Sequence, residues 1–150
     1  KLKILKHKAM KKTLTTIAAA FMLFVSLNSF ATVMANPLKD VTSTTVINTY
    51  LEATTLGSVA LNKFLFADDF EYRNTANGDK FSKKEYSNFL KKHKGVQFDC
   101  KTSYEILDQS GQACVAKATM VFEKFTRVDY ITLSQDQDGW KVSKVVTTYP

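Results

Sequence analysis

The stretch from Val96 to Tyr149 decides the fold, because it holds four segments of strand-forming residues separated by turns. The segments are Val96-Gln97-Phe98-Asp99-Cys100, Gln112-Ala113-Cys114-Val115, Asp129-Tyr130-Ile131-Thr132-Leu133 and Gly139-Trp140-Lys141-Val142. Turns are expected at residues 109–111, 124–126 and 136–139. Four strands joined by short turns predict one antiparallel sheet.

The alternation of side chains along these strands predicts which face of the sheet is covered. In the first strand, odd-numbered positions are polar, and the apolar even-numbered positions are Val96, Phe98, Cys100, Tyr104 and Ile106. This alternation is typical of an antiparallel sheet covered on one side. One face of the second strand carries Cys114, Ala116, Ala118, Met120 and Phe122. The inward face of residues 127–134 stays open, because Tyr130 competes there with Ile131 and Leu133.

Three helices are predicted upstream of the sheet, and we expect them to cover its apolar face. The first runs from about Asp40 or Thr42 to Leu56, and Gly57 ends it. A shorter second helix spans residues 58–66, and residues 70–73 form a short strand. The third helix has the clearest start, since Ser82-Lys83-Lys84-Glu85 is a capping box, and it ends near residues 93–95.

Residues 1–35 have the order of a secretory signal peptide. Six lysines come first, nine apolar residues follow from Ile17 to Val25, and small residues precede a cleavage site. We expect cleavage after Ala35, with Ala31 as the second choice. The rival interpretation is an uncleaved membrane anchor, but a spanning helix needs about 20 mostly apolar residues. The expected product is one domain, residues 36–150, in the periplasm or outside the cell, with no stable membrane span.

The charge of the chain lies largely in this leader. The whole chain carries a formal net charge of +7, whereas residues 36–150 hold fifteen basic and fourteen acidic residues, a net charge of +1. A nucleic-acid surface needs clustered excess positive charge, so we expect no nucleic-acid partner. One basic run remains, which we interpret as the solvated face of a helix: Lys83, Lys84, Lys91, Lys92 and Lys94.

The two cysteines, Cys100 and Cys114, lie on neighbouring predicted strands. If the strands pair about a turn near Ser110, the cysteines are offset by six residues, roughly 20 Å at the rise of a strand. A disulfide needs Cα atoms within about 7 Å, so we expect two free, buried thiols and no disulfide. We expect no metal site either, because the chain has no CxxC motif and His93 is the only histidine after residue 35.

Six short segments carry a family resemblance that covers residues 40–149. They are Thr49-Tyr50-Leu51-Glu52-Ala53, Gly57 with Leu61 and Phe64, Phe66-Ala67-Asp68-Asp69-Phe70-Glu71-Tyr72, Phe81-Ser82-Lys83-Lys84-Glu85-Tyr86, Asp129-Tyr130-Ile131-Thr132-Leu133, and Asp138-Gly139-Trp140-Lys141-Val142. In this order they resemble the nuclear transport factor 2-like superfamily, most of all the small exported bacterial branch labelled lumazine-binding. The resemblance implies a cone-shaped, cystatin-like α+β fold. Its curved antiparallel sheet has about four long strands plus a short one, packed on three N-terminal helices with a pocket between them. It also implies homodimers through the sheet.

Aromatic residues are the main candidates for the wall of such a pocket. Fifteen follow residue 35, and aromatic side chains can line an apolar pocket with tyrosine hydroxyls as polar groups. The expected pocket residues are Tyr50, Tyr72, Tyr86, Tyr104, Met120, Tyr130 and Trp140. The first functional hypothesis is therefore a non-catalytic binding module for a small aromatic or heterocyclic ligand.

The alternative is a cofactor-free lyase or isomerase of the ketosteroid-isomerase-like type. The resemblance implies that such an enzyme places an Asp, Tyr or His inside the pocket as its acid or base. His93 falls at a helix end among lysines, where a solvated cation is expected. Asp129 and Asp69 remain as catalytic candidates. The hypothesis requires one of these two acids to be buried against Tyr130 or Tyr72.

Overall fold

The computed structural model of the protein describes residues 34–150. The predicted signal peptide lies almost entirely outside the described residues. Within them, no helix has the length and apolar character needed to cross a membrane. The segment Asn36–Pro150 is one compact unit. Its elements, in chain order, are α2 (Ser43–Thr55), α3 (Asn62–Leu65), β1 (Phe66–Asn74), β2 (Lys80–Ser82), α4 (Lys83–Lys92), β3 (Lys101–Ser110), β4 (Ala113–Val121), β5 (Thr126–Asp136) and β6 (Gly139–Thr148).

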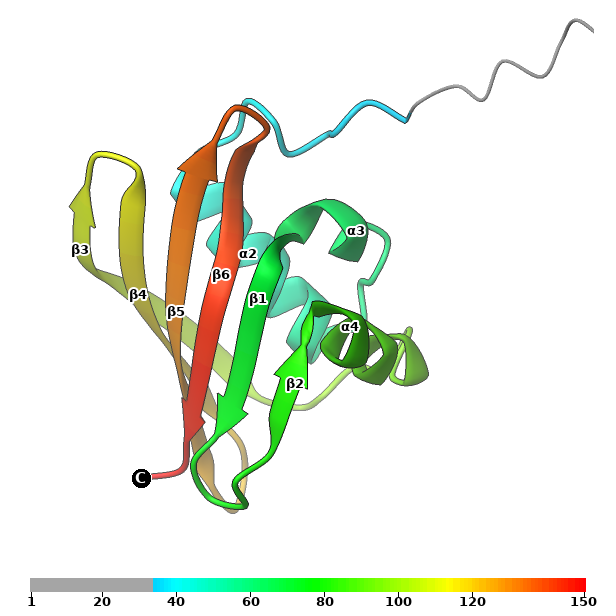
Figure 1. The fold of residues 1–150 in the computed structure, drawn as a ribbon. Helices are drawn as coiled ribbons and strands as arrows, with labels where there is room; N and C mark the ends of the chain where they lie inside the picture. The colour runs from blue at the N-terminus through cyan, green and yellow to red at the C-terminus, as the bar shows by residue number, and fades with distance from the viewer. Residues whose placement is uncertain (1–33) are drawn as a thin grey trace, which may run out of the picture. The chain divides into compact units, whose positions relative to one another are not determined.

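The six strands form one sheet in the order β2-β1-β6-β5-β4-β3. Strands β3 to β6 pair with their neighbours in the predicted antiparallel manner. β1 pairs with β6 in parallel, so the sheet is mixed and has one more strand than predicted. The helices lie on one face of this sheet, which curves around α2 (Figure 1). The predicted α+β architecture is thus confirmed, with six strands in place of five.

The second predicted helix is much shorter than expected, and β1 is longer. α3 spans only four residues, and β1 begins at Phe66 rather than Phe70. Phe66 is buried, and its ring lies 4.6 Å from that of Phe70. A shift in register between Phe66 and Glu71 interrupts the alternation of the strand. Because of this irregularity, the start of β1 does not show the period of two that identifies a strand.

The first long strand, β3, begins at Lys101, and residues 96–100 are not part of it. These residues run along the end of α2, where the Phe98 N–H donates to the Thr55 carbonyl at 2.8 Å. β3 is the edge strand and pairs only with β4. On its predicted inward face Tyr104 is half-buried, but Ile106 is exposed. The predicted covered face is therefore wrong for most of this strand, because it lies at the edge of the sheet and the helices cover little of it.

The burial of alternate side chains shows which face of β5 points toward the helices. Asp129, Ile131 and Leu133 are buried on the helix side, whereas Tyr130 is 40% exposed on the other face. The same face of β4 carries the fully buried Ala116, Ala118 and Met120. Both cysteines are free thiols; Cys114 is buried, as predicted, but Cys100 is only partly buried, which corrects that part of the prediction. In the register of β3 and β4, Cys114 lies opposite Gln109.

The helix ends follow the predicted signals. Ser82 and Glu85 form the capping box of α4, which is confirmed: the Glu85 carboxylate accepts from the Ser82 N–H at 2.8 Å. The Thr42 hydroxyl accepts from the Thr45 N–H and caps α2.

Gly57, just after α2, has a positive φ of 63°. A Cβ atom there would lie 2.4 Å from the backbone nitrogen of Gly95. Glycine therefore allows the ends of α2 and α4 to meet.

Candidate ligand site at Arg127 and Asp129

Asp129 is the centre of a buried polar cluster between the sheet and the helices. Its side chain is 0% exposed. Oδ1 accepts from Thr147 Oγ1 at 2.6 Å and from Arg127 Nε at 2.9 Å. Oδ2 accepts from Tyr50 Oη at 2.7 Å and from Arg127 Nη2 at 2.8 Å. A carboxylate has about four acceptor positions, so these four hydrogen bonds use all of them.

Arg127 shares a strand face with Asp129, because residues two apart in a strand point the same way. Its side chain is 17% exposed, and the guanidinium binds the carboxylate through two parallel hydrogen bonds. Burial by itself would lower the pKa of Arg127, but the charge of Asp129 outweighs it and raises the pKa well above its ordinary value. The guanidinium therefore stays charged, and its position is fixed.

Two tyrosine hydroxyls connect this ion pair to the helices. Tyr50 comes from α2 and Tyr86 from α4, and their oxygens lie 3.3 Å apart. Burial raises the pKa of Tyr86 to about 12. Burial, together with the charge of Asp129, also raises the pKa of Tyr50. Both hydroxyls therefore remain protonated at neutral pH and act as hydrogen-bond donors. Tyr72 stacks on Tyr86 with ring centroids 4.6 Å apart, which extends the aromatic packing to β1.

A small cleft of about 60 Å³ opens beside this cluster. Arg127 and Tyr86 line it, and Gly57, Phe89, His93 and Phe98 are among the residues that complete its wall. Phe89 and Phe98 are each 41% exposed and lie at its rim. The His93 ring is 4.8 Å from Phe89 and 6.3 Å from Phe98, between centroids. The cleft therefore combines the cationic guanidinium of Arg127 with aromatic side chains at its rim.

His93 is held in one orientation at this rim. Its Nδ1 lies 3.0 Å from the backbone carbonyl oxygen of Phe89. A carbonyl can only accept, so Nδ1 carries a hydrogen, and Nε2 makes no hydrogen bond to any of residues 34–150. His93 was expected to be solvated at a helix end. In the structure it is half-buried and packs against an aromatic ring.

The structure brings together some of the predicted pocket residues and separates others. Tyr50, Tyr72 and Tyr86 gather around Asp129, and Met120 is fully buried opposite Arg127 in the sheet. Of the seven predicted residues, Tyr86 alone borders the cleft.

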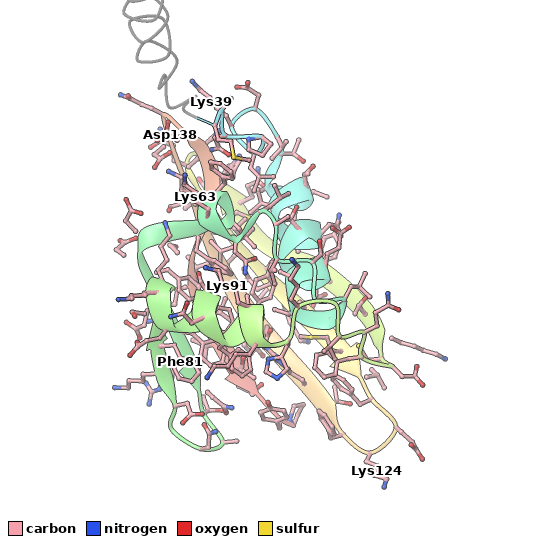
Figure 2. All side chains as sticks on the ribbon, turned by 90° about the vertical axis from the view of Figure 1, so that its right-hand side faces the viewer. Lys39, Lys63, Phe81, Lys91, Lys124 and Asp138 are labelled. Carbon is pink, nitrogen blue, oxygen red and sulfur yellow. The ribbon has the colours of Figure 1, made fainter. Side chains whose placement is uncertain are left out.

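Tyr104, Tyr130 and Trp140 do not belong to this group. Tyr104 lies on the edge strand and Tyr130 on the opposite face of the sheet. Trp140 follows the β5–β6 turn. Figure 2 shows Asp138 of that turn at one end of the sheet and Lys124 of the β4–β5 turn, near Arg127, at the other.

The catalytic candidates are also separated. Asp69 is exposed on β1, and its neighbour Asp68 pairs with Lys83 at 2.8 Å. Asp129 is buried, but its tyrosine partner is Tyr50 rather than Tyr130. Within residues 34–150, no group of three or more His, Cys, Asp or Glu side chains could hold a metal ion.

Sequence reasoning missed Arg127, Phe89 and Phe98. For Arg127 a signal was present: opposite charges two residues apart on one strand, Arg127 and Asp129, can share the buried face as a pair. Phe98 could not be placed in this way, because it belongs to the segment before β3 and reaches the cleft through the path of the backbone.

Comparisons with known proteins agree with this fold. An NTF2-like protein of unknown function from Silicibacter pomeroyi is 14% identical, with a TM-score of 0.59, and the match covers 71% of this chain and 92% of the other. An NTF2-like protein from Cytophaga hutchinsonii is 15% identical, with a TM-score of 0.60, covering 71% and 94%. An uncharacterised protein with a cystatin-like fold from Caulobacter vibrioides is 12% identical, with a TM-score of 0.56, covering 71% and 86%. The comparison with curated proteins finds no match.

These structural likenesses establish the fold alone, since the identities are low. A sequence family adds to them: the family described as "Putative lumazine-binding" matches residues 39–148, which include every helix and strand of the described unit. The expected family resemblance is therefore confirmed: the fold is like that of NTF2-like proteins, and the chain belongs to the "Putative lumazine-binding" family.

Proposed function

We propose that the protein is an exported, non-catalytic binding module that holds a small, flat heterocyclic ligand against Arg127. One observation carries the proposal: a charged guanidinium, fixed by Asp129, lines a cleft that also has exposed aromatic side chains in its wall. Asp129 uses Nε and Nη2 of Arg127. Among the described residues, Nη1 makes no hydrogen bond, so its N–H groups can serve a ligand. Arg127 would therefore provide directional hydrogen bonds to the ligand, and the aromatic rim would provide apolar contact.

The size of the cleft limits how a ligand can bind. Pockets that enclose a whole ligand measure roughly 300–1,000 Å³. A cleft of about 60 Å³ admits only the edge of a ring. The remainder of a flat ligand would lie across Phe89 and Phe98, whose exposed rings offer stacking surfaces. We expect a ring that carries oxygen acceptors on one edge, facing Arg127.

The charge of the site favours a neutral acceptor or a weakly acidic edge over a strong anion. Asp129 balances Arg127, so the pair has no net charge to offer. The guanidinium still presents directional N–H donors, which suit ring carbonyl oxygens. The family description names lumazine, a bicyclic heterocycle with ring carbonyl groups, and that compound has the required chemistry.

A binding titration with lumazine tests this proposal. Replacing Phe98 by Ala removes a stacking surface without touching the buried cluster, and we expect affinity to fall by about 3- to 10-fold, the value of one aromatic contact. The matched control is Phe125→Ala, which removes a ring of similar exposure from the β4–β5 turn and should leave affinity unchanged. Fluorescence or calorimetric titration measures both. No binding of lumazine or related heterocycles to the unmodified protein would contradict the proposal.

The second candidate is the lyase or isomerase, which the burial of Asp129 beside Tyr50 favours. Its difficulty is that a base needs a free lone pair, whereas Asp129 already accepts four hydrogen bonds. Arg127 would have to withdraw before Asp129 could take a proton. Deuterium exchange into an enolisable ketone, present in the unmodified protein and lost in Asp129→Asn, would favour this candidate.

Export and a homodimer through the outer face of the sheet are further parts of the proposal. The order of residues in 1–35 supports export, and a mature protein that begins at Asn36, measured by mass spectrometry, would support cleavage after Ala35. The exposed apolar residues Val121 and Tyr130 on the outer face support a second copy there.

A further inference from the structure

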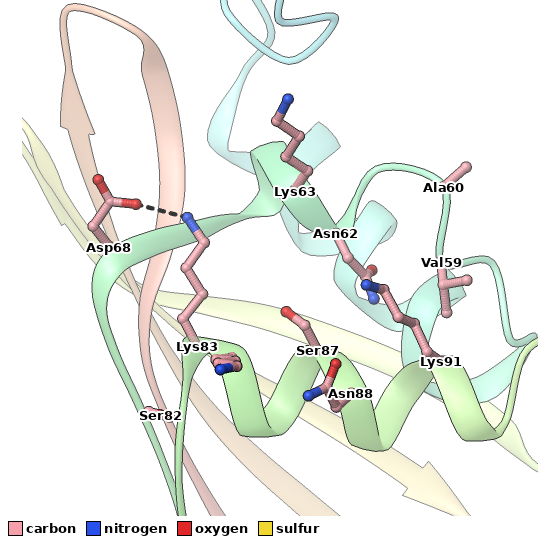
Figure 3. A pocket seen from close by; sticks show the side chains of 11 residues that line it. Val59, Ala60, Asn62, Lys63, Asp68, Ser82, Lys83, Ser87, Asn88 and Lys91 are labelled. Carbon is pink, nitrogen blue, oxygen red and sulfur yellow. Dashed lines mark hydrogen bonds and ion pairs between the residues drawn. The ribbon is translucent and has the colours of Figure 1, made fainter.

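A second and larger hollow lies on the outside of the helices, between α3 and α4. It measures about 610 Å³, which is within the range of ligand pockets. Its lining includes Asn62 of α3 and, from α4, Lys84, Ser87 and Lys91. We refer to it as the α3–α4 groove. It shares no lining residue with the cleft at Arg127. Figure 3 shows the side chains of the groove.

The α4 wall of the groove is a regular stripe. Lys84, Ser87, Asn88 and Lys91 line it, at helix positions i, i+3, i+4 and i+7. Residues with this spacing lie on one face of a helix. Lys92 and Lys94 belong to the same basic run but do not line the groove. The structure thus divides the run into lysines that face the groove and lysines that do not.

Positive charge exceeds negative charge around the groove. Four lysines and one acid, Asp68, line it. Asp68 pairs with Lys83 at 2.8 Å. Lys84 and Lys91 are exposed and make no ion pair with any described residue. Lys63 points away from α4 (Figure 3). Two cations on the α4 stripe therefore remain available to an anionic ligand.

A buried amide in the groove wall has no partner. Asn62 is only 2% exposed, and among the described residues neither its Nδ2 nor its Oδ1 has a hydrogen-bond partner. Buried polar groups are rarely left unpaired, so such a group calls for an explanation. Figure 3 shows its side chain directed toward α4, on the side to which Lys91 extends. An amide presents both donors and an acceptor, which together suit a hydroxyl group.

We infer that the α3–α4 groove binds a small hydroxylated phosphate ester. Lys84 and Lys91 bind the phosphate, because lysine ammonium groups are common phosphate ligands. Asn62 and Ser87 bind the hydroxyl groups. A cation does not fit, because the lysines would repel it, and Lys83 already neutralises Asp68. The unpaired amide distinguishes this groove from an ordinary basic surface, which would attract phosphate without recognising the rest of the molecule.

An NMR titration of the full chain tests this inference, with sn-glycerol 3-phosphate as the probe and glycerol and inorganic phosphate as comparisons. We expect saturable shifts at the amides of Asn62, Ser87 and Lys91. Replacing Lys84 and Lys91 by Ala should weaken binding by about tenfold or more, the value of hydrogen bonds to charged groups. The matched control replaces Lys92 and Lys94 by Ala. It removes the same charge from the same run and should leave affinity within about twofold.

The variant Asn62→Leu tests whether the groove recognises the hydroxyl groups of the ligand or only attracts its charge. It keeps every lysine and removes the amide, so binding of sn-glycerol 3-phosphate should fall to the level of inorganic phosphate. The inference is overturned if the two double-lysine variants lose affinity equally, or if Asn62→Leu changes nothing. It is also overturned if phosphatidylglycerol vesicles bind while sn-glycerol 3-phosphate does not, because the groove would then recognise a lipid surface.

Discussion

At the scale of single residues, the buried charge of Asp129 and its partners have the largest effect on the stability of the fold. A carboxylate with no exposed surface is costly unless it is paired and hydrogen-bonded, and here Arg127, Tyr50 and Thr147 provide this. Replacing such a pair by apolar residues is often neutral, but removing one partner is not. The cluster therefore fixes the guanidinium, and it connects two helices to the sheet.

Asp129→Asn should cause a large loss of stability. It leaves the Arg127 charge buried without a counter-charge, so we expect the free energy of unfolding to fall by about 3–5 kcal/mol. Urea denaturation measures this. The control is Asp68→Asn, which breaks an exposed pair and should leave stability unchanged. Adding Arg127→Met to Asp129→Asn should restore most of the loss. Equal losses for Asp129→Asn and Asp68→Asn would show that the buried pair has no special role.

The pKa of Tyr86 makes stability depend on pH in the alkaline range. Its folded-state pKa is about 12, raised by burial, against an ordinary value of 10.0. Between these values the folded state keeps a proton that the unfolded state loses. Stability is therefore complete below pH 10 and falls as pH rises toward 12, by about 1.4 kcal/mol per pH unit for one such group. Urea denaturation at increasing alkaline pH should show a shallower fall for Tyr86→Phe than for exposed Tyr149→Phe.

At the scale of elements, the ends of the helices set the shape of the cleft. Gly57 follows α2 and its carbonyl accepts from the Gly95 N–H at 3.0 Å, just beyond α4. Near this contact the ring of His93 lies between those of Phe89 and Phe98, with centroids 4.8 and 6.3 Å away. The capping box of α4 was readable from four residues, because a cap is a local interaction. The contact between Gly57 and Gly95 joins distant parts of the chain, so no local pattern could predict it.

Gly57→Ala should disturb both stability and the cleft. The added Cβ would overlap the backbone of Gly95 and His93, at 2.4 and 2.5 Å, and backbone atoms cannot move aside cheaply. The control is Gly78→Ala, which has a similar positive φ but open space around it. We expect Gly78→Ala to lower the free energy of unfolding by about 1–2 kcal/mol and Gly57→Ala by clearly more. Gly57→Ala should also weaken ligand binding, and an equal loss in both variants would exclude the steric explanation.

At the scale of the described unit, the sequence predicted the sheet well and the site only in part. The meander from β3 to β6 follows from alternation and turns, which are local. The parallel pairing of β1 with β6 joins residues about 70 positions apart, and a register shift obscures it. Tyr50 and Tyr86 were predicted for the pocket from their residue type. Arg127 was missed because the inward face of residues 127–134 stayed open, so its pairing with Asp129 on a buried face was not recognised.

The outer face of the sheet carries the last prediction, which concerns the proposed homodimer. Tyr130 is 40% exposed on that face, on a central strand away from the helices. If a second copy covers it, Tyr130→Glu replaces a buried ring by a charge in the interface and should shift the protein toward monomer. The control is Leu56→Glu, which places a charge at an apolar residue of similar exposure at the end of α2, on the helix side. Sedimentation or light scattering over a range of concentrations should show a dimer for the unmodified protein and for Leu56→Glu. A monomer at all concentrations would mean that this face has no partner copy, and the exposed tyrosine would then need another explanation.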